Sequence, residues 1–301
     1  MSFSGDVKNE LCRQGVSRLC CARAEAYGVL LCCSTFTARE VRIVTENADF
    51  ALRLPRLFRR AFGVEFDRLP EDETGQEGRK FVFQITGEDK LHTAIDLLGY
   101  EARQNLVLHI NFAMLEEECC RNAFLRGAFL AGGSVTDPVK RYHLELTTSH
   151  LQASRELAAL LREMGYEPRQ VVRSGYQVTY FKSSRQIEEL LTRVGAPLSA
   201  MDLMNAKAEK DLRNGVNRRV NCEAANVGKV VDAAQEQLAA IGRLYELGRV
   251  EGLPEKLKET IVLRETYPEL SLSELAAEFD PPISKSALSH RLRKLCALAE
   301  Q

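Results

Sequence analysis

The stretch Cys119–Ser134, CCRNAFLRGAFLAGGS, has a near-copy earlier in the chain at Cys20–Ser34, CCARAEAYGVLLCCS. Each copy is typical of an apolar helix with one glycine in its middle, Gly28 in the first and Gly127 in the second. A mid-helix glycine costs roughly 1 kcal/mol relative to alanine, so it usually marks a close approach of two backbones. The pattern therefore predicts a pseudo-twofold helix pair that meets at these two glycines.

Composition limits the class of protein to which this helix pair can belong. The chain has 301 residues, of which 45% are hydrophobic, and its formal net charge is -1. That length suits about two domains with real cores. The balanced charge gives no global indication of nucleic acid, so any basic surface must be local.

The nine cysteines show no CxxC pair and no histidine at zinc-ligand spacing. The N-terminal stretch MSFSGDVKNELCR is polar and amphipathic, unlike a signal peptide or a membrane span. We therefore expect a cytoplasmic protein with reduced, mostly buried thiols, and neither a metal nor a cofactor. Cys32 and Cys33 are alternatively a redox pair, although packing is the commoner role of a free cysteine.

The two halves of the chain repeat one order of elements. In the first half, strand material at Phe36–Thr45 precedes a helix capped by Asn47, kinked at Pro55 and ended by Gly63. The half continues with a short strand at Val64–Arg68, a charged loop at Leu69–Lys80, a strand at Lys80–Thr86 and a helix at Lys90–Leu98.

The second half follows the same order. A turn at Asp137-Pro138 and a strand at Tyr142–Thr148 precede a helix that Ser149 caps and Gly165 ends. A strand at Gln177–Lys182 follows, and then a helix that Ser184 caps and that ends at Val194. Each half is therefore predicted as helix, two strands, helix, two strands, helix, which is a duplicated α+β fold.

The paired helices and the order of elements resemble the LAGLIDADG homing endonucleases, whose paired helices form the domain interface. In that family the eighth motif residue is an acid that holds the catalytic metal. Here LRGAFLAGG has Gly132 at that place, and AYGVLLCCS has Cys33. Metal-dependent phosphodiester hydrolysis needs hard oxygen ligands. Asp137 and Glu40 lie several residues beyond the motif, so we predict no catalytic residue and no enzyme activity.

From Met201 the sequence predicts long helix. Amide and guanidinium side chains recur there at three- and four-residue steps, which places them on one stripe, and Gly215 and Gly228 are expected to loosen the helix. A solvated face and a surface that touches DNA phosphates or base edges are about equally favoured. The stripe comprises Asn214, Asn217, Arg218 and Asn221.

The tail from Leu253 predicts three short helices. Pro254 opens the first, Ser271 caps the second with Glu274 as capping-box partner, and Ser284 caps the third at Lys285–Leu298. Helix, short turn, helix is a helix-turn-helix arrangement. The third helix contains no acid, which favours DNA contact. Its candidate DNA-binding residues are Lys285, Ser286, Ser289, His290, Arg291, Arg293 and Lys294.

A degenerate LAGLIDADG pair followed by a helix-turn-helix resembles the WhiA family of bacterial transcription regulators. The resemblance includes SFSGDVKNEL, RGAFLAGGS, NRRVNCEAAN and KSALSHRLRKL, and it covers nearly the whole chain. It implies a nucleoid-associated DNA-binding protein of cell division and chromosome segregation, or of sporulation in spore-formers. Double-stranded DNA is then the partner, together with other transcription or division proteins. The expected divisions are a first repeat at 1–112, a second at 113–205, a helical linker at 206–252 and the helix-turn-helix at 253–301.

Two other classes of function remain open at this stage. One is a metal-dependent endonuclease that uses other carboxylates. The other is a scaffold that binds division partners without any need for DNA.

Overall fold

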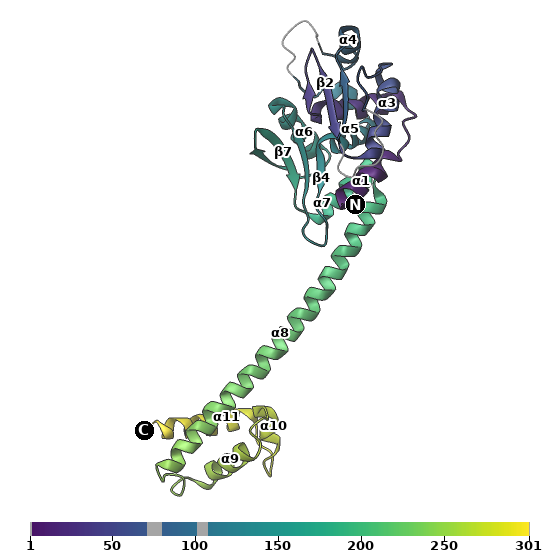
Figure 1. Cartoon of the computed structure of the whole chain (residues 1–301). Coiled ribbons are helices and arrows are strands. Elements are labelled where there is room, and N and C mark those ends of the chain that lie inside the picture. Colours follow the sequence, from purple (N-terminus) through teal and green to yellow (C-terminus); the bar gives the residue numbers. More distant parts are fainter. Residues whose placement is uncertain (1, 71–79, 101–107, 301) are drawn as a thin grey trace. The chain divides into compact units, whose positions relative to one another are not determined.

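The computed structural model describes residues 2–70, 80–100 and 108–300. The chain forms two compact units, Met1–Lys210 and Asp211–Gln301 (Figure 1). No helix in the described ranges is long and apolar enough to cross a membrane. The charged loop expected at 69–80 falls largely on residues 71–79, outside the described residues.

The first repeat contains a three-stranded antiparallel sheet in the order β1-β2-β3. In the central strand, alternate residues such as Val41 and Ile43 are buried, which is the period-two pattern expected from the sequence. Asn47 accepts a hydrogen bond from the Phe50 amide, and Gly63 ends the helix with φ of 71°, as predicted. The elements are α1 (Phe3–Cys12), α2 (Leu19–Cys32), β1 (Thr35–Phe36), β2 (Val41–Thr45), α3 (Ala48–Phe62), β3 (Phe81–Ile85) and α4 (Glu88–Leu97).

The second repeat contains a four-stranded antiparallel sheet in the order β4-β5-β7-β6. Leu144 and Leu146 of the inner strand β5 are buried. The elements are a 3-10 helix η1 (Phe112–Leu115), α5 (Glu118–Gly132), β4 (Gly133–Val135), β5 (Leu144–Thr148), α6 (Leu151–Glu163), β6 (Arg169–Arg173), β7 (Tyr176–Phe181) and α7 (Ser184–Val194).

The predicted duplicated α+β fold is confirmed, with small local differences. The stretch Val64–Arg68 is not a strand; Arg68 forms an isolated bridge to Gln84 of β3. The N-cap residue of α6 is His150, one residue after the expected Ser149. The N-cap residue of α7 is Ser183, one residue before the expected Ser184. Local propensity alone leaves cap positions uncertain by a residue or two.

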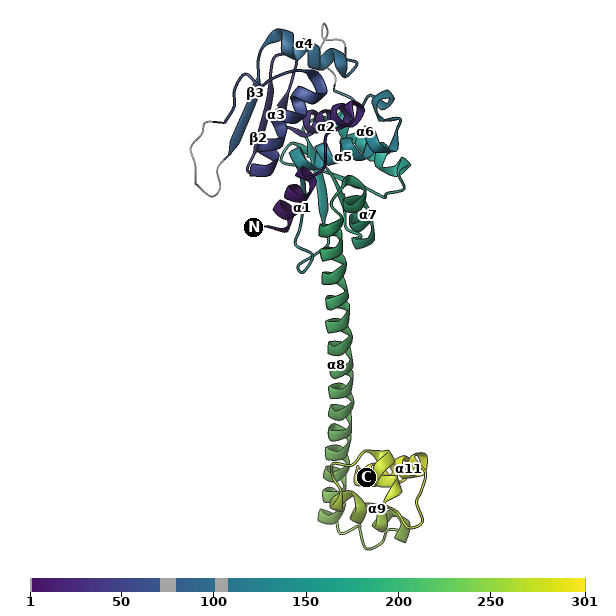
Figure 2. The ribbon, with the colours of Figure 1, turned by 90° about the vertical axis from the view of Figure 1, so that its right-hand side faces the viewer.

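Helices α2 and α5 lie together in the middle of the N-terminal unit (Figure 2). From Ala24 to Cys32, every residue of α2 is buried, as expected for a helix that is covered all round. A Cβ built on Gly28 would stand 2.0 Å from the Phe124 carbonyl oxygen, and one on Gly127 would stand 1.9 Å from that of Glu25. Both glycines therefore lie at the contact between the two helices.

Helix α8 (Pro197–Glu246) begins in the N-terminal unit and ends in the C-terminal unit. It continues through Gly215 and Gly228, the two glycines expected to loosen it, without a break. Both glycines are surrounded by solvent, which shows that no packing conflict forces a break there.

The C-terminal unit has its own hydrophobic core. The last turns of α8 contribute Ala240, Ile241 and Leu244 to it, so the compact unit includes the end of this helix. Pro254 is the N-cap of the next helix rather than its first residue. The remaining helices are α9 (Glu255–Thr266), α10 (Leu272–Ala277) and α11 (Lys285–Ala299).

Candidate nucleic-acid interface

Helices α10 and α11 form the two-helix element of the C-terminal unit. Ser271 accepts a hydrogen bond from the Glu274 amide, and the Glu274 carboxylate accepts one from the Ser271 amide at 2.9 Å, which completes the predicted capping box. The small side chain of Ala276 is buried, and the backbone carbonyl of Ala276 accepts a hydrogen bond from the Ile283 amide at 3.1 Å. These contacts fix the turn that leads into α11.

The buried side of α11 is apolar. Leu288, Leu292 and Leu295 are each at most 2% exposed and pack in the core of the unit. Ser284 caps the helix by accepting a hydrogen bond from the Ala287 amide at 3.2 Å, as predicted. Three- and four-residue spacing of the leucines leaves the opposite side of the helix free of core contacts.

That opposite side is exposed and carries basic and neutral polar groups together with the small side chains of Ala287 and Ala297, and no acid. Arg293 lies on this side and makes long hydrogen bonds to Ser289, at 3.3 and 3.4 Å, which its guanidinium can exchange for another acceptor. Ser289 itself is half-buried. The exposed members of the predicted set are Lys285, Ser286, His290, Arg293 and Lys294.

Arg291 differs from the other predicted residues, because its side chain is directed toward α9 and is only 18% exposed. Its guanidinium lies 5.3 Å from the centre of the Phe279 ring and donates to the Lys256 carbonyl at 3.3 Å. The Glu259 carboxylate is 3.5 Å away. These contacts give Arg291 an internal packing role, which separates it from the outward face of α11.

The polar stripe of α8 is exposed, and the helix carries a second stripe on another side. Asn214, Asn217, Arg218 and Asn221 are all exposed. On the helical wheel, the apolar stripe is centred roughly 130° away. It consists of the exposed side chains Leu212, Val216, Val220, Val227 and Val231.

The ends of α2 and α5 show what occupies the two motif positions that lack acids. The Cys33 thiol is buried and donates to the carbonyl oxygens of Leu30 and Thr35. Burial raises its pKa to about 12, so this thiol stays neutral. A Cβ on Gly132 would stand 2.3 Å from the Thr147 carbonyl oxygen, so this position has no room for a side chain.

Neither nearby acid is directed to those positions. The Asp137 carboxylate accepts a hydrogen bond from the Val139 amide at 2.9 Å and so holds its own turn. The Glu40 carboxylate accepts one from the Gln84 side chain at 3.0 Å. Both carboxylates thus have local structural partners.

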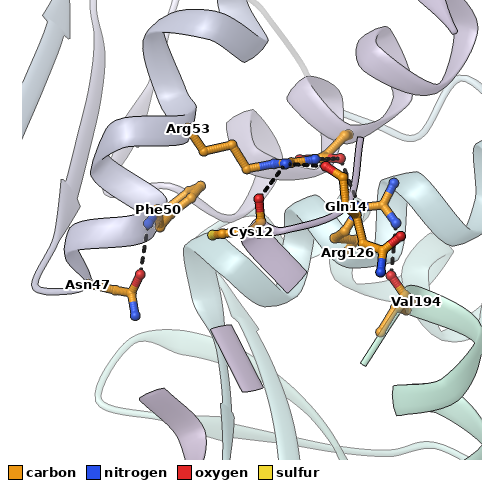
Figure 3. A network of polar contacts seen from close by, with 8 residues as sticks. Cys12, Gln14, Asn47, Phe50, Arg53, Arg126 and Val194 are labelled. Atoms are coloured by element: carbon orange, nitrogen blue, oxygen red, sulfur yellow. Dashed lines mark hydrogen bonds and ion pairs between the residues drawn. The ribbon is translucent and has the colours of Figure 1, made fainter. Parts of the chain in front are cut away.

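A buried ion network that the sequence analysis missed joins the two repeats (Figure 3). The Glu25 carboxylate of α2 is bound by Arg53 of α3 at 2.6 and 2.9 Å and by Arg126 of α5 at 2.8 Å. Arg53 also donates to the carbonyls of Cys12 and Gln14, and Arg126 donates to that of Val194. The carboxylate is 1% exposed, so both guanidiniums are needed to compensate its desolvation.

A second missed carboxylate holds the start of α8. Glu10 of α1 accepts hydrogen bonds from the amides of Leu198 and Ser199 at 2.7 and 2.8 Å and from the Ser199 hydroxyl at 2.6 Å. These amides belong to the first turn of α8, where no intrahelical acceptor exists. In the sequence, Glu10 is one acid in an amphipathic helix, and nothing near it indicates a partner nearly two hundred residues away.

The fold and these positions define a class of protein: a duplicated LAGLIDADG-like domain with glycine and cysteine at its acid positions, followed by a helix-turn-helix domain. Family models agree, since the WhiA LAGLIDADG-like domain matches residues 121–213 and the WhiA C-terminal HTH domain matches residues 216–299.

The chain belongs to the WhiA family. It is 36% identical to a protein of Ruminiclostridium cellulolyticum named "Probable cell division protein WhiA", with 100% of this chain and 98% of that protein covered. A protein of the same name from Desulforudis audaxviator is 38% identical, covering 100% and 97%. Among solved structures, full-length DUF199/WhiA from Thermatoga maritima matches with a TM-score of 0.60 at 21% identity, covering 100% and 98%.

Proposed function

We propose that this chain is a sequence-specific DNA-binding regulator of bacterial cell division and chromosome segregation, with a role in sporulation where the host forms spores. Its place is the cytoplasm, on the nucleoid. The observation that carries the proposal is the outward face of α11, which has exposed cations such as Lys285 and Arg293 and no acid along the helix. Such a face suits the phosphates and base edges of the major groove.

The individual roles follow from side-chain chemistry. Arg293 has the planar donor pair that suits a guanine edge, and Lys294 suits a phosphate. Ser286, Ser289 and His290 supply further donors and acceptors on the same side. Arg291 acts through the packing of α11 on α9, because its guanidinium already has partners there.

The LAGLIDADG-like domain is proposed to be catalytically inactive. Support comes from the buried, neutral Cys33 thiol and from the lack of space at Gly132. Hydrolysis of this kind needs carboxylates at both positions to hold a hard cation. The domain then serves as a scaffold for α8 or as additional binding surface.

Genome-wide mapping of DNA bound to the chain in its host tests the proposal. We expect enrichment at discrete sites that share a sequence, and loss of that enrichment for the Lys285→Ala/Arg293→Ala variant. Arg155→Ala is the matched control, since it removes an exposed cation from α6, which belongs to the N-terminal unit. Uniform, sequence-independent recovery with every variant would contradict the proposal.

A division-partner scaffold is the second candidate, favoured by the exposed apolar stripe of α8. Side chains such as Leu212 and Val227 are 72% and 63% exposed, which is uncommon for large apolar groups without a partner. Under this alternative, a chain ending before Leu253 still supports normal division. Loss of division control by that truncation would instead favour the DNA-binding function.

A further inference from the structure

Four cysteine thiols meet where the two central helices begin. Cys20 and Cys21 are the second and third residues of α2, and Cys119 and Cys120 are the second and third residues of α5. Their four Sγ atoms all lie within 4.8 Å of one another. The pseudo-twofold relation of the helices thus brings two adjacent pairs together, although the chain has no CxxC motif.

The spacing of the sulfur atoms matches a set of metal ligands. The Sγ atoms of Cys20 and Cys21 are 3.9 Å apart, and those of Cys119 and Cys120 are 4.0 Å apart. Four sulfurs around a tetrahedral zinc ion, each at about 2.3 Å, lie about 3.8 Å from one another. The observed separations therefore need little adjustment to close around one cation.

The surroundings of the cluster favour negative sulfur. The four cysteines lie in the first turns of α2 and α5, neither of which has a side-chain cap, and the positive end of a helix dipole favours a thiolate in such a position. The Arg18 guanidinium lies 3.9 Å from Cys119 Sγ.

Each of the four sulfurs binds a cation as a thiolate, so a thiol must lose its proton before it coordinates. A divalent cation that binds all four sulfurs releases the remaining thiol protons to solvent. Binding therefore weakens as the pH falls, because protons then compete with the metal.

We propose that Cys20, Cys21, Cys119 and Cys120 form a tetrathiolate site for a zinc-type divalent cation, which joins the two repeats at the start of α2 and α5. Four protein ligands leave no open coordination position, so the site is structural rather than catalytic. Cys120 is buried and Cys20 is exposed, which gives the cation a route from solvent. The site does not depend on the proposed DNA binding.

Cobalt(II) titration of the full chain, purified under reducing conditions and stripped of metal, tests the site. We expect saturation at about one cobalt per chain, with the sulfur-to-metal charge-transfer and d–d absorption of tetrahedral thiolate coordination. Zinc should displace the cobalt and abolish these bands. The absence of tetrahedral thiolate bands in the wild-type chain would overturn the proposal whatever the variants do.

Two double variants assign the ligands. Cys20→Ser/Cys119→Ser removes one thiol from each pair and should abolish the cobalt spectrum. Cys222→Ser/Cys296→Ser removes two thiols of the C-terminal unit and should leave it unchanged. Equal spectra from both variants would place the cobalt elsewhere and contradict the assignment.

Thermal unfolding and mass spectrometry give independent readouts. A chelator should lower the unfolding temperature of the zinc-loaded wild type and of the control, but not that of the Cys20→Ser/Cys119→Ser variant. The chief rival is a pair of disulfides between the two helices. Chelator-insensitive stability, with loss of two hydrogen masses per bridge in chain isolated without oxidant, would establish that rival and exclude the metal site.

Discussion

Gly127 of α5 lies directly against the backbone of Glu25 of α2, where a Cβ would stand 1.9 Å from the Glu25 carbonyl oxygen. The reciprocal contact is nearly equal, since a Cβ on Gly28 would stand 2.0 Å from the carbonyl oxygen of Phe124. Real Cβ atoms are not found so close to a backbone oxygen, so any larger residue must move the helices apart. The two glycines thus set the separation of the repeats.

Gly127→Ala should therefore lower the stability of the N-terminal unit. Overpacking typically costs about 1–3 kcal/mol, and more where backbone must shift. Gly15→Ala is the control, because a Cβ there meets nothing within 4 Å. Denaturant unfolding of both variants gives the comparison. An unchanged midpoint for Gly127→Ala would show that the helices do not meet at this residue.

The Glu25 network gives a second stability prediction. Glu25→Gln leaves the buried guanidiniums of Arg53 and Arg126 without their counter-charge, and breaking a buried pair costs about 3–5 kcal/mol. The control is Glu65→Gln, whose pair with Arg59 is 68% exposed on both sides and contributes at most about 1 kcal/mol. Equal losses of unfolding free energy in the two variants would contradict the structural importance of the network.

How far the sequence predicts this molecule depends on the distance over which residues interact. The Ser271–Glu274 capping box and the Asn47 cap each involve residues three positions apart, so the local sequence is enough to predict them. Glu25 binds Arg126 from the other repeat, and no local pattern indicates such a pair. Cys20 and Cys119 are equivalent in the two repeats, so the internal alignment indicates that the two cysteine pairs lie close together, which ligand spacing within one stretch of sequence does not indicate.

The contribution of Asp67 to the stability of the fold depends on pH at the acidic end of the range. Its pKa is lowered to about 2 by hydrogen bonds from Lys90 and from the amides of Gly87 and Thr86 at the start of α4. A lowered folded-state pKa means that the carboxylate stabilises the fold above its usual pKa of 3.8 and that this contribution disappears as the pH falls through about 2.

Asp67→Asn should consequently destabilise the unit at neutral pH, by at most about 1 kcal/mol because the ion pair is partly exposed. The difference from wild type should shrink between about pH 4 and pH 2. Denaturant unfolding at several pH values measures it. A difference that grows toward low pH would mean that folding raises the pKa of Asp67 instead of lowering it.

The chain should not cleave DNA. Incubation of purified protein with supercoiled plasmid and magnesium or manganese is expected to give no nicked product, because neither Cys33 nor Gly132 offers a carboxylate. Gly132→Asp should not create activity, since its Cβ would collide with the Thr147 carbonyl. Nicking that survives further purification and disappears in Asp137→Asn would instead support the endonuclease alternative.

Substitutions of Arg291, Arg293 and Lys294 in α11 should affect DNA binding in different ways. Arg291 and Arg293 are two residues apart, about 200° around the helix, so they face different surroundings. Arg291→Ala removes the contacts with Phe279 and the Lys256 carbonyl, and it should lower the stability of the C-terminal unit. Its effect on DNA affinity should therefore follow its effect on folding.

Arg293→Ala should act on recognition itself. We expect a cost of about 1–3 kcal/mol at the preferred site and relaxed base preference there. Lys294→Ala should weaken binding to every duplex alike and reduce the slope of log affinity against log salt by about one. Titration of both variants against specific and scrambled duplexes at several salt concentrations separates the two effects. If both bind like wild type, and removal of the residues after Leu253 also leaves affinity intact, then α11 does not read DNA and the LAGLIDADG-like domain must do so.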